Sequence, residues 1–148
     1  MTPAEAIDLV DFARNPVLQR RDIDGDGTME TCCNFAVKAA ADKCGVPMIT
    51  GRAREMLSDI DRAAWRGGGP WYAVNEAIAR VAANAGLFVV AGWTNPDASK
   101  SSHIALCRPT LADAARIHVG QAGRVNFNDG PVTAGFGDLP VKFWIYAR

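Results

Sequence analysis

The chain has 148 residues, the size of one domain that can bury a hydrophobic core without disulfide bonds. Its 16 basic residues balance its 16 acidic residues and 49% of the residues are hydrophobic, a composition typical of a globular protein. The basic residues are spread along the chain without a run, so nothing in the charge pattern indicates binding to nucleic acid.

The N-terminal segment carries acidic residues where a secretory signal carries basic ones, and it has no long apolar stretch. The longest apolar run, around Leu87 to Trp93, is far shorter than the roughly 20 residues that span a bilayer. We therefore expect a protein without a membrane segment, made in the cytoplasm and delivered by another apparatus if its substrate lies outside. Two of the four cysteines are neighbours in sequence, which favours reduced thiols over a disulfide framework.

The first half of the chain has helical patterns. Thr2 begins a capping motif that predicts a helix over about residues 3–14. A second helix is predicted between Thr31 as the N-cap and Gly45 as the C-terminal stop. The residues predicted to face the core from this helix are Cys33, Val37, Ala40, Ala41 and Cys44.

Two further helices are predicted over residues 53–65 and 71–86, from apolar residues at helical spacing. After Gly86 the pattern changes to the alternation and short apolar runs typical of strands. The predicted strands cover residues 87–93, 103–109, 116–123 and 141–147. Helices followed by strands predict one α+β domain over residues 1–148, with N-terminal helices packed on a small antiparallel β-sheet. No glycine-rich phosphate-binding motif occurs, so no organic cofactor is expected.

Cys33 is expected at the second position of its helix, where free backbone N–H groups and the helix dipole stabilise a thiolate. A nucleophilic thiolate needs a general base, and the two histidines are His103 and His118. Alternation places His103 on one face of its strand with Ala105 and Cys107, and we expect the Cys33 helix to pack on this small face. The alternative is that Cys33 is a small buried hydrophobic residue and His103 a polar residue with satisfied hydrogen bonds.

The order of the motifs resembles a known family. TCCNFAVKAAADKCGVPM, followed by GLFVVAGW and SSHIAL, is similar to the papain-like Cys/His peptidoglycan amidases of the CHAP and NlpC type, which include phage lysins and amidase effectors of type VI secretion. The resemblance covers about residues 22–146 and implies a papain-like core with Cys33 as nucleophile and His103 as base. The third polar residue of the family, which orients the imidazole, corresponds to Gln121 or Asn126. Ser102 is a departure, because a glycine often precedes the histidine.

The resemblance implies a cysteine hydrolase that cleaves an amide bond in cell-wall peptidoglycan through a thiolate acyl-enzyme. Backbone N–H groups at the start of the Cys33 helix would hold the oxyanion. The implied partners are peptidoglycan peptide stems and, for a secreted effector, a delivery apparatus and an immunity protein, and we expect a monomer. Two alternatives stay open, namely a non-catalytic calcium-dependent binding module of the same fold and a thiol hydrolase that acts on another amide.

The loop DIDGDGTME, which precedes the second helix, has carboxylates at alternate positions. Its first three match the opening positions of an EF-hand calcium loop, but Cys33 occupies position twelve, where an EF-hand has a bidentate Glu. The sequence therefore predicts a lower-affinity Ca²⁺ site that fixes the loop ahead of Cys33. The expected oxygen ligands are Asp22, Asp24, Asp26, Thr28 and Glu30. The alternative is a polar turn without an ion.

Aromatic side chains are further candidates for binding a cell-wall sugar or peptide, although most of them are expected in the core and in turns. The segment GGGPWY, residues 67–72, combines a glycine run with two aromatic residues. We expect this segment to form a rim beside the Cys33 site.

Overall fold

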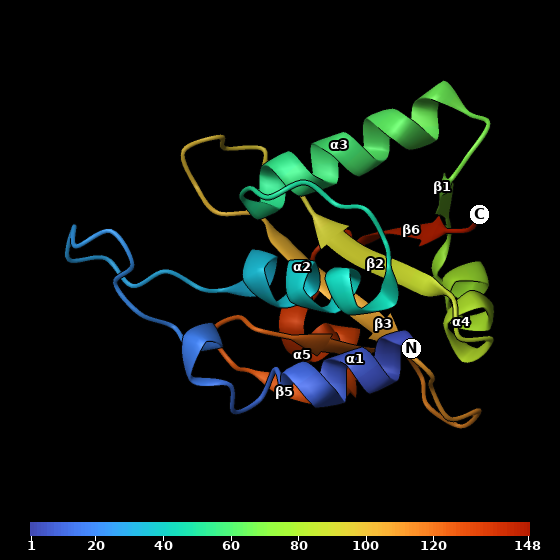
Figure 1. Ribbon diagram of the computed structural model, residues 1–148, viewed down its shortest axis with the longest axis horizontal. Helices are drawn as coiled ribbons and strands as arrows, with labels where there is room; N and C mark the ends of the chain where they lie inside the picture. Colours follow the sequence, from blue (N-terminus) through green and yellow to red (C-terminus); the bar gives the residue numbers. More distant parts are fainter.

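Six strands form one antiparallel β-sheet in the computed structural model, which describes residues 1–148 (Figure 1). The spatial order of the strands is β1-β6-β2-β3-β4-β5, so β2 and β3 lie at the centre of the sheet. The strands are β1 (Trp71–Val74), β2 (Phe88–Trp93), β3 (His103–Arg108), β4 (His118–Gln121), β5 (Phe127–Pro131) and β6 (Lys142–Tyr146). The predicted α+β class with an antiparallel sheet is confirmed.

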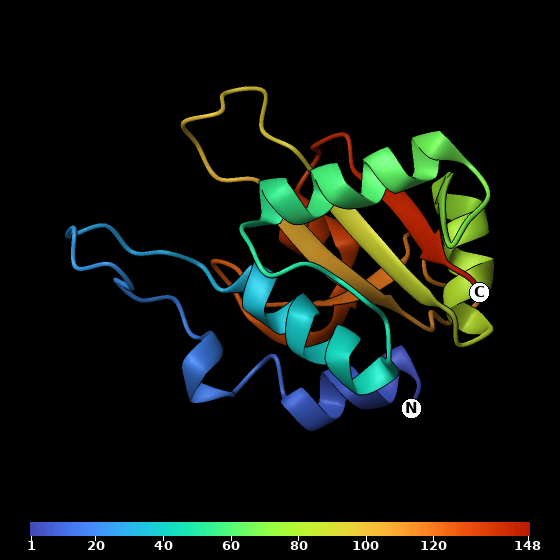
Figure 2. The same ribbon diagram turned by 45° about the horizontal axis from the view of Figure 1, so that its top comes forward.

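Helices cover both faces of this sheet (Figures 1 and 2). They are α1 (Pro3–Val10), α2 (Cys33–Cys44), α3 (Ala53–Arg66), α4 (Glu76–Asn84) and α5 (Val132–Phe136), with a 3₁₀ turn η1 (Pro16–Leu18) after α1. The hydrophobic core is divided by the sheet into two clusters. One cluster joins α1, α2 and α3 to side chains such as Ile104 and Leu106. The other joins α4 and α5 to side chains such as Ala105 and Cys107.

The ends of the first two helices follow from local chemistry. The Thr2 side chain accepts the Glu5 N–H, and the Glu5 carboxylate accepts the Thr2 N–H, which is the predicted capping box. Helix α2 ends at Gly45, as predicted, in the left-handed conformation with φ 69° that glycine adopts without strain. The start of α2 differs from the prediction, because Cys32 is the N-cap and Cys33 is the first helical residue.

The predicted helix over residues 71–86 is wrong in its first part. Residues Trp71–Val74 form strand β1, which pairs with β6, and α4 begins only after Asn75, whose side chain accepts the Ile78 N–H. The four residues WYAV suit either structure locally, and pairing with β6, about 70 residues later, selects the strand. Strand β5 and helix α5 were not predicted. No helix combines the length and the apolar character needed to cross a membrane.

Candidate active site

Cys33 lies at the first position of α2, with its thiol against the beginning of strand β3. Its side chain is almost fully buried, at 4% exposure. Burial raises the pKa of the Cys33 thiol, while hydrogen bonding by the backbone N–H groups of Ile104 and Asn34 and by the Thr31 side chain acts in the opposite direction. The sulfur therefore already has hydrogen-bond donors around it that favour a thiolate, although the resting thiol is neutral.

The imidazole of His103 lies at the first residue of β3 and contacts two other elements. Its Nε2 is 2.8 Å from Oε1 of Gln121 on β4, and its ring centroid is 4.6 Å from that of Phe136 on α5. Burial lowers the pKa of His103, and the hydrogen bond to Gln121 raises it by less than burial lowers it. The imidazole is therefore neutral at physiological pH, which a general base must be.

The amide of Gln121 determines which imidazole nitrogen carries the proton. Its Nε2 donates to the carbonyl of Val125 at 2.8 Å, so its Oε1 is the atom that faces His103. A carbonyl oxygen only accepts hydrogen bonds, so Nε2 of His103 must be the protonated nitrogen. The neutral imidazole consequently has its free lone pair on Nδ1, the nitrogen available to take a proton from a thiol.

Two glycines allow this arrangement. A Cβ at Gly135 on α5 would lie 1.8 Å from Oε1 of Gln121, so any larger residue would displace the amide. A Cβ at Gly123 would lie 3.2 Å from Cε1 of His103. Sequence reasoning missed Gly135 and Phe136, because their only signal is a short VTAGF segment that resembles a loop.

The structure contradicts the prediction that α2 packs on the His103 face of β3. That face, with Ala105 and Cys107, packs against α4 and α5, whereas α2 packs against the opposite face, with Ile104 and Leu106. The small side chains were expected to admit α2, but the alanines of α4 fill that space instead. The Cys33 sulfur therefore lies beside the backbone of Ile104, the residue after His103, and no hydrogen bond joins the sulfur to the imidazole.

Asn126, the other predicted orienting residue, makes different contacts. Its Nδ2 donates to the carbonyl of Leu18 at 2.9 Å, and its Oδ1 accepts the Gly123 N–H at 2.9 Å. The Nδ2 end therefore connects the turn between β4 and β5 to η1, and the Oδ1 end closes the turn itself. Asn126 forms no hydrogen bond with His103, and of the two candidates it is Gln121 that binds the imidazole.

The remaining thiols and the second histidine lie away from this cluster. Cys32 is fully buried and its sulfur is 3.6 Å from the carbonyl oxygen of Gln19. Burial strongly raises the pKa of the Cys107 thiol. His118 pairs with Arg108 at the far end of β3, and its Nδ1 lies 2.6 Å from Oδ1 of Asp129. Ser102, the departure from the family pattern, accepts the Asn95 N–H with its hydroxyl and so closes the loop before β3.

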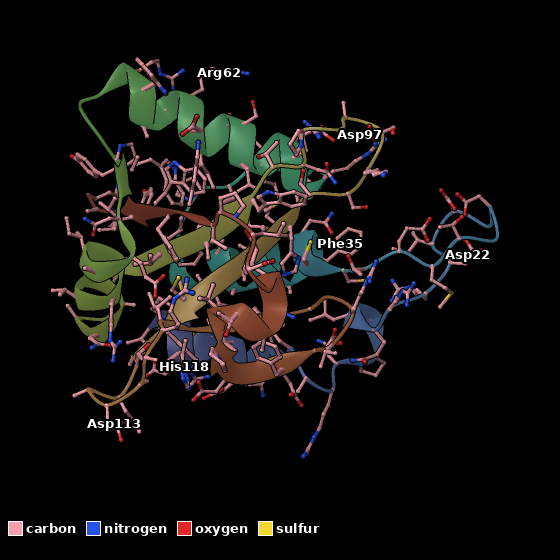
Figure 3. All side chains as sticks on the ribbon, turned by 180° about the vertical axis from the view of Figure 1, so that it is seen from behind. Asp22, Phe35, Arg62, Asp97, Asp113 and His118 are labelled. Carbon is pink, nitrogen blue, oxygen red and sulfur yellow. The ribbon has the colours of Figure 1, made fainter.

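The acidic loop extends away from the body of the protein, with Asp22 near its end (Figure 3). Ligand oxygens of the three predicted aspartates and Glu30 all lie within 4.8 Å of one another. Hydrogen bonds from the N–H groups of Gly27 and Gly25 lower the pKa of Asp22. The Asp26 N–H also lowers the pKa of Asp24, but desolvation and the charges of Asp26 and Glu30 outweigh it, so this pKa is raised.

These oxygens fit a hard divalent cation. Carboxylates gathered within 4.8 Å repel one another, as the raised pKa of Asp24 shows, and Ca²⁺ would relieve that repulsion. Thr28 lies in the same loop, and its N–H donates to Oδ1 of Asp26. Exposed acidic turns also occur without an ion, so the cluster is compatible with a calcium site and does not require one.

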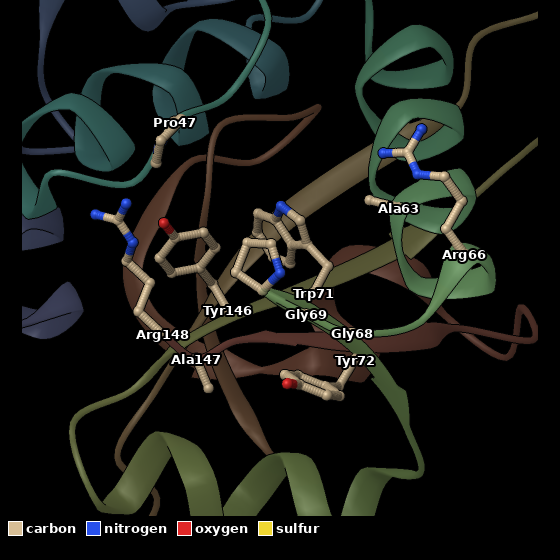
Figure 4. A pocket seen from close by; sticks show the side chains of 11 residues that line it. Pro47, Ala63, Arg66, Gly68, Gly69, Trp71, Tyr72, Tyr146, Ala147 and Arg148 are labelled. Atoms are coloured by element: carbon tan, nitrogen blue, oxygen red, sulfur yellow. The ribbon is translucent and has the colours of Figure 1, made fainter.

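A cavity of about 610 Å³ beside strand β1 is not lined by Cys33 or His103 (Figure 4). It is lined by the segment 67–72 that was predicted to form a rim beside the Cys33 site. That prediction is wrong, because the segment and His103 lie at opposite ends of β2. Trp71 pairs with Tyr146, and Tyr146 pairs with Phe88, the first residue of β2. His103 pairs with Trp93, the last residue of β2. The five residue-to-residue steps between the first and last residues of β2 separate these two ends by about 17 Å.

No protein-family model matches the chain, and no curated protein is significantly similar to it. The functional interpretation therefore depends on the geometry of Cys33, His103 and Gln121, which come from α2, β3 and β4.

Proposed function

We propose that the protein is a cysteine hydrolase that cleaves an amide bond in bacterial cell-wall peptidoglycan, with a papain-like arrangement of its catalytic residues. The observation that carries the proposal is the hydrogen bond of 2.8 Å between Nε2 of His103 and Oε1 of Gln121. This bond orients the imidazole and leaves Nδ1 free, beside a strand terminus where the Cys33 sulfur also lies.

The reaction begins when Nδ1 of His103 accepts the proton of the Cys33 thiol. The resulting thiolate attacks the amide carbonyl carbon, and N–H groups at the start of α2 stabilise the oxyanion. The imidazolium then gives its proton to the departing amine as the C–N bond breaks, which leaves a thioester on Cys33. Water loses a proton to Nδ1 and attacks this thioester, releasing the carboxylic acid and restoring the thiol.

For the first step the sulfur must approach Nδ1 more closely than it does in the resting structure. Catalytic hydrogen bonds are often long in unliganded enzymes and tighten when substrate binds. The raised pKa of the thiol and the lowered pKa of the imidazole both favour a neutral resting pair. In this proposal the proton is therefore transferred only after substrate has bound, immediately before attack, and the resting site is not a thiolate–imidazolium ion pair.

The assignment to peptidoglycan comes from the resemblance of the motifs around Cys33 and His103 to cell-wall amidases. On this reading the substrate is a peptide stem, and delivery through phage lysis or a secretion apparatus brings the protein to it. A secretion effector would also require an immunity protein in the producing cell. A non-catalytic binding module of the same fold and a hydrolase of other amides are the alternatives, and no particular observation favours either.

Purified peptidoglycan incubated with the protein tests this proposal by mass spectrometry of the soluble fragments. We expect new fragments that carry one additional water per bond cut, and their masses will identify the sugar–peptide amide or a peptide cross-bridge as the bond cleaved. The matched samples are the Cys33→Ala and Cys44→Ala variants, since Cys44 lies at the other end of the same helix. Fragments from the Cys33→Ala variant, or none from a folded wild type, would contradict the proposal.

We also propose that the acidic loop binds Ca²⁺ and that the ion holds the loop in place ahead of α2. Ca²⁺ at about 100 times its Kd is expected to raise the Tm by about 5 °C or more. Asp24→Asn should abolish this shift in differential scanning calorimetry, while Asp113→Asn, an exposed aspartate in a distant loop, should leave it unchanged (Figure 3). An equal shift in both variants would show that the cation acts elsewhere.

A further inference from the structure

The cavity of about 610 Å³ beside strand β1 has a lining unlike that of the Cys33 site (Figure 4). Its volume is within the range of small-molecule binding sites. Two arginines, Arg66 at the end of α3 and Arg148 after β6, line it, and no acidic residue does. The rings of Trp71 and Tyr146 lie between the two arginines in the close-up view.

Both arginines are available to a ligand. The arginines that form hydrogen bonds or ion pairs within the protein are Arg21, Arg52, Arg54, Arg80, Arg108 and Arg116. Arg66 and Arg148 are not among them. The Arg66 guanidinium therefore has no carboxylate partner in the protein, and a ligand carboxylate would pair with it through charge-assisted hydrogen bonds.

The aromatic residues add further donors. The indole N–H of Trp71 donates to no acceptor in the protein, unlike that of Trp144, which donates to Asp61 at 3.1 Å. Among the buried side-chain nitrogen and oxygen atoms, only Nε of Arg108 lacks a hydrogen-bond partner. The Trp71 N–H also lacks a partner, so it is not buried and must reach the surface, although the residue as a whole is only 5% exposed. The Tyr146 hydroxyl also has no partner and reaches the surface for the same reason.

The backbone groups of the cavity also offer hydrogen-bond donors rather than acceptors. The carbonyl of Pro70 already accepts the Ala147 N–H at 2.8 Å, so this acceptor is occupied. The N–H groups of Gly68 and Gly69 donate to no backbone carbonyl. The cavity therefore presents mainly donors and positive charge around an aromatic floor, which suits an anion attached to an apolar group better than an isolated inorganic ion.

We propose that this cavity binds the free C-terminal carboxylate of a short peptide, with Arg66 pairing with the carboxylate, the aliphatic side chains packing on Trp71 and Tyr146, and Arg148 lying on the other side of these rings. The site lies at the opposite end of β2 from His103. Binding here is therefore separate from hydrolysis and does not require that the proposed activity be correct.

NMR spectroscopy of the full chain tests this assignment, with the Trp71 indole N–H signal, assigned by triple-resonance experiments, as the readout. The Cys33→Ala background prevents cleavage of the probes. The probes are N-acetyl-alanyl-alanine, the same dipeptide with a C-terminal amide, and inorganic phosphate. We expect a saturable shift with the free carboxylate and at least about tenfold weaker binding of the amide, since a charged hydrogen-bond partner is lost. Phosphate is expected to bind more weakly than the free peptide.

Two variants of α3 complete the experiment. Arg66→Gln should weaken binding of the carboxylate peptide by about tenfold, whereas Arg62→Gln, one turn earlier on the same helix and outside this cavity, should not change it. Each of four results would overturn the assignment: no saturable shift up to about 10 mM peptide, equal binding of acid and amide, phosphate binding as tightly as the peptide, or equal effects of the two variants.

Discussion

Replacing Cys33 with Ala is expected to reduce the rate of peptidoglycan cleavage by about 10⁴-fold or more, the scale seen when a nucleophile or its base is removed. His103→Ala should cause a loss of similar size, because the thiol then lacks the nitrogen that takes its proton. The double variant should be no slower than either single variant, since the two residues act as one unit. The measurement is the initial rate of fragment release at a fixed concentration of folded protein.

Matched variants separate this effect from a change in folding. Cys44→Ala removes a thiol from the same helix, and His118→Ala removes the histidine of β4 that pairs with the far end of β3 and binds Asp129. Both should retain most of the activity. If His118→Ala were as damaging as His103→Ala, or if His103→Ala kept substantial activity, the assignment of the base would be wrong.

Replacing Gln121 with Leu is expected to reduce kcat by about 100-fold, the lower end of what general acid–base catalysis contributes. Leucine has a similar size but accepts no hydrogen bond, so the imidazole loses its orientation and the Nε2 proton loses its partner. The KM should change little, because Gln121 acts through His103. Gly135→Ala should reproduce this loss, since its Cβ would displace Gln121, while Thr133→Ala, an exposed residue of the same helix, should not.

The pH dependence distinguishes orientation by Gln121 from a merely structural role. His103 must be unprotonated to act as a base, and burial lowers its pKa, so the activity of the wild type should persist to a pH below the ordinary pKa of histidine. In Gln121→Glu a carboxylate would still accept the Nε2 proton and would raise the pKa of His103. The acidic limb of the kcat/KM profile should then move to higher pH. A profile that does not move would argue against contact between residue 121 and the base.

Several elements were predictable because their signals are local. The capping box at Thr2, the left-handed Gly45 and the apolar run of the strand that His103 begins each depend on residues within a few positions of one another. Strand β1 and helix α5 were not predictable in this way. β1 is four residues long and pairs with β6 about 70 positions away, and α5 is a five-residue helix that rests on Gln121.

The sequence by itself determined which residues carry the distinctive chemistry, namely a cysteine at a helix start, a histidine at a strand start and an amide on the next strand. Only the tertiary structure decided how they meet. Strand register places Gln121, and not Asn126, against the imidazole. Both faces of β3 are apolar and buried, so alternation alone cannot assign α2 to one of them. That choice depends on which helix fills the volume on each side, a property of side chains that are distant in sequence.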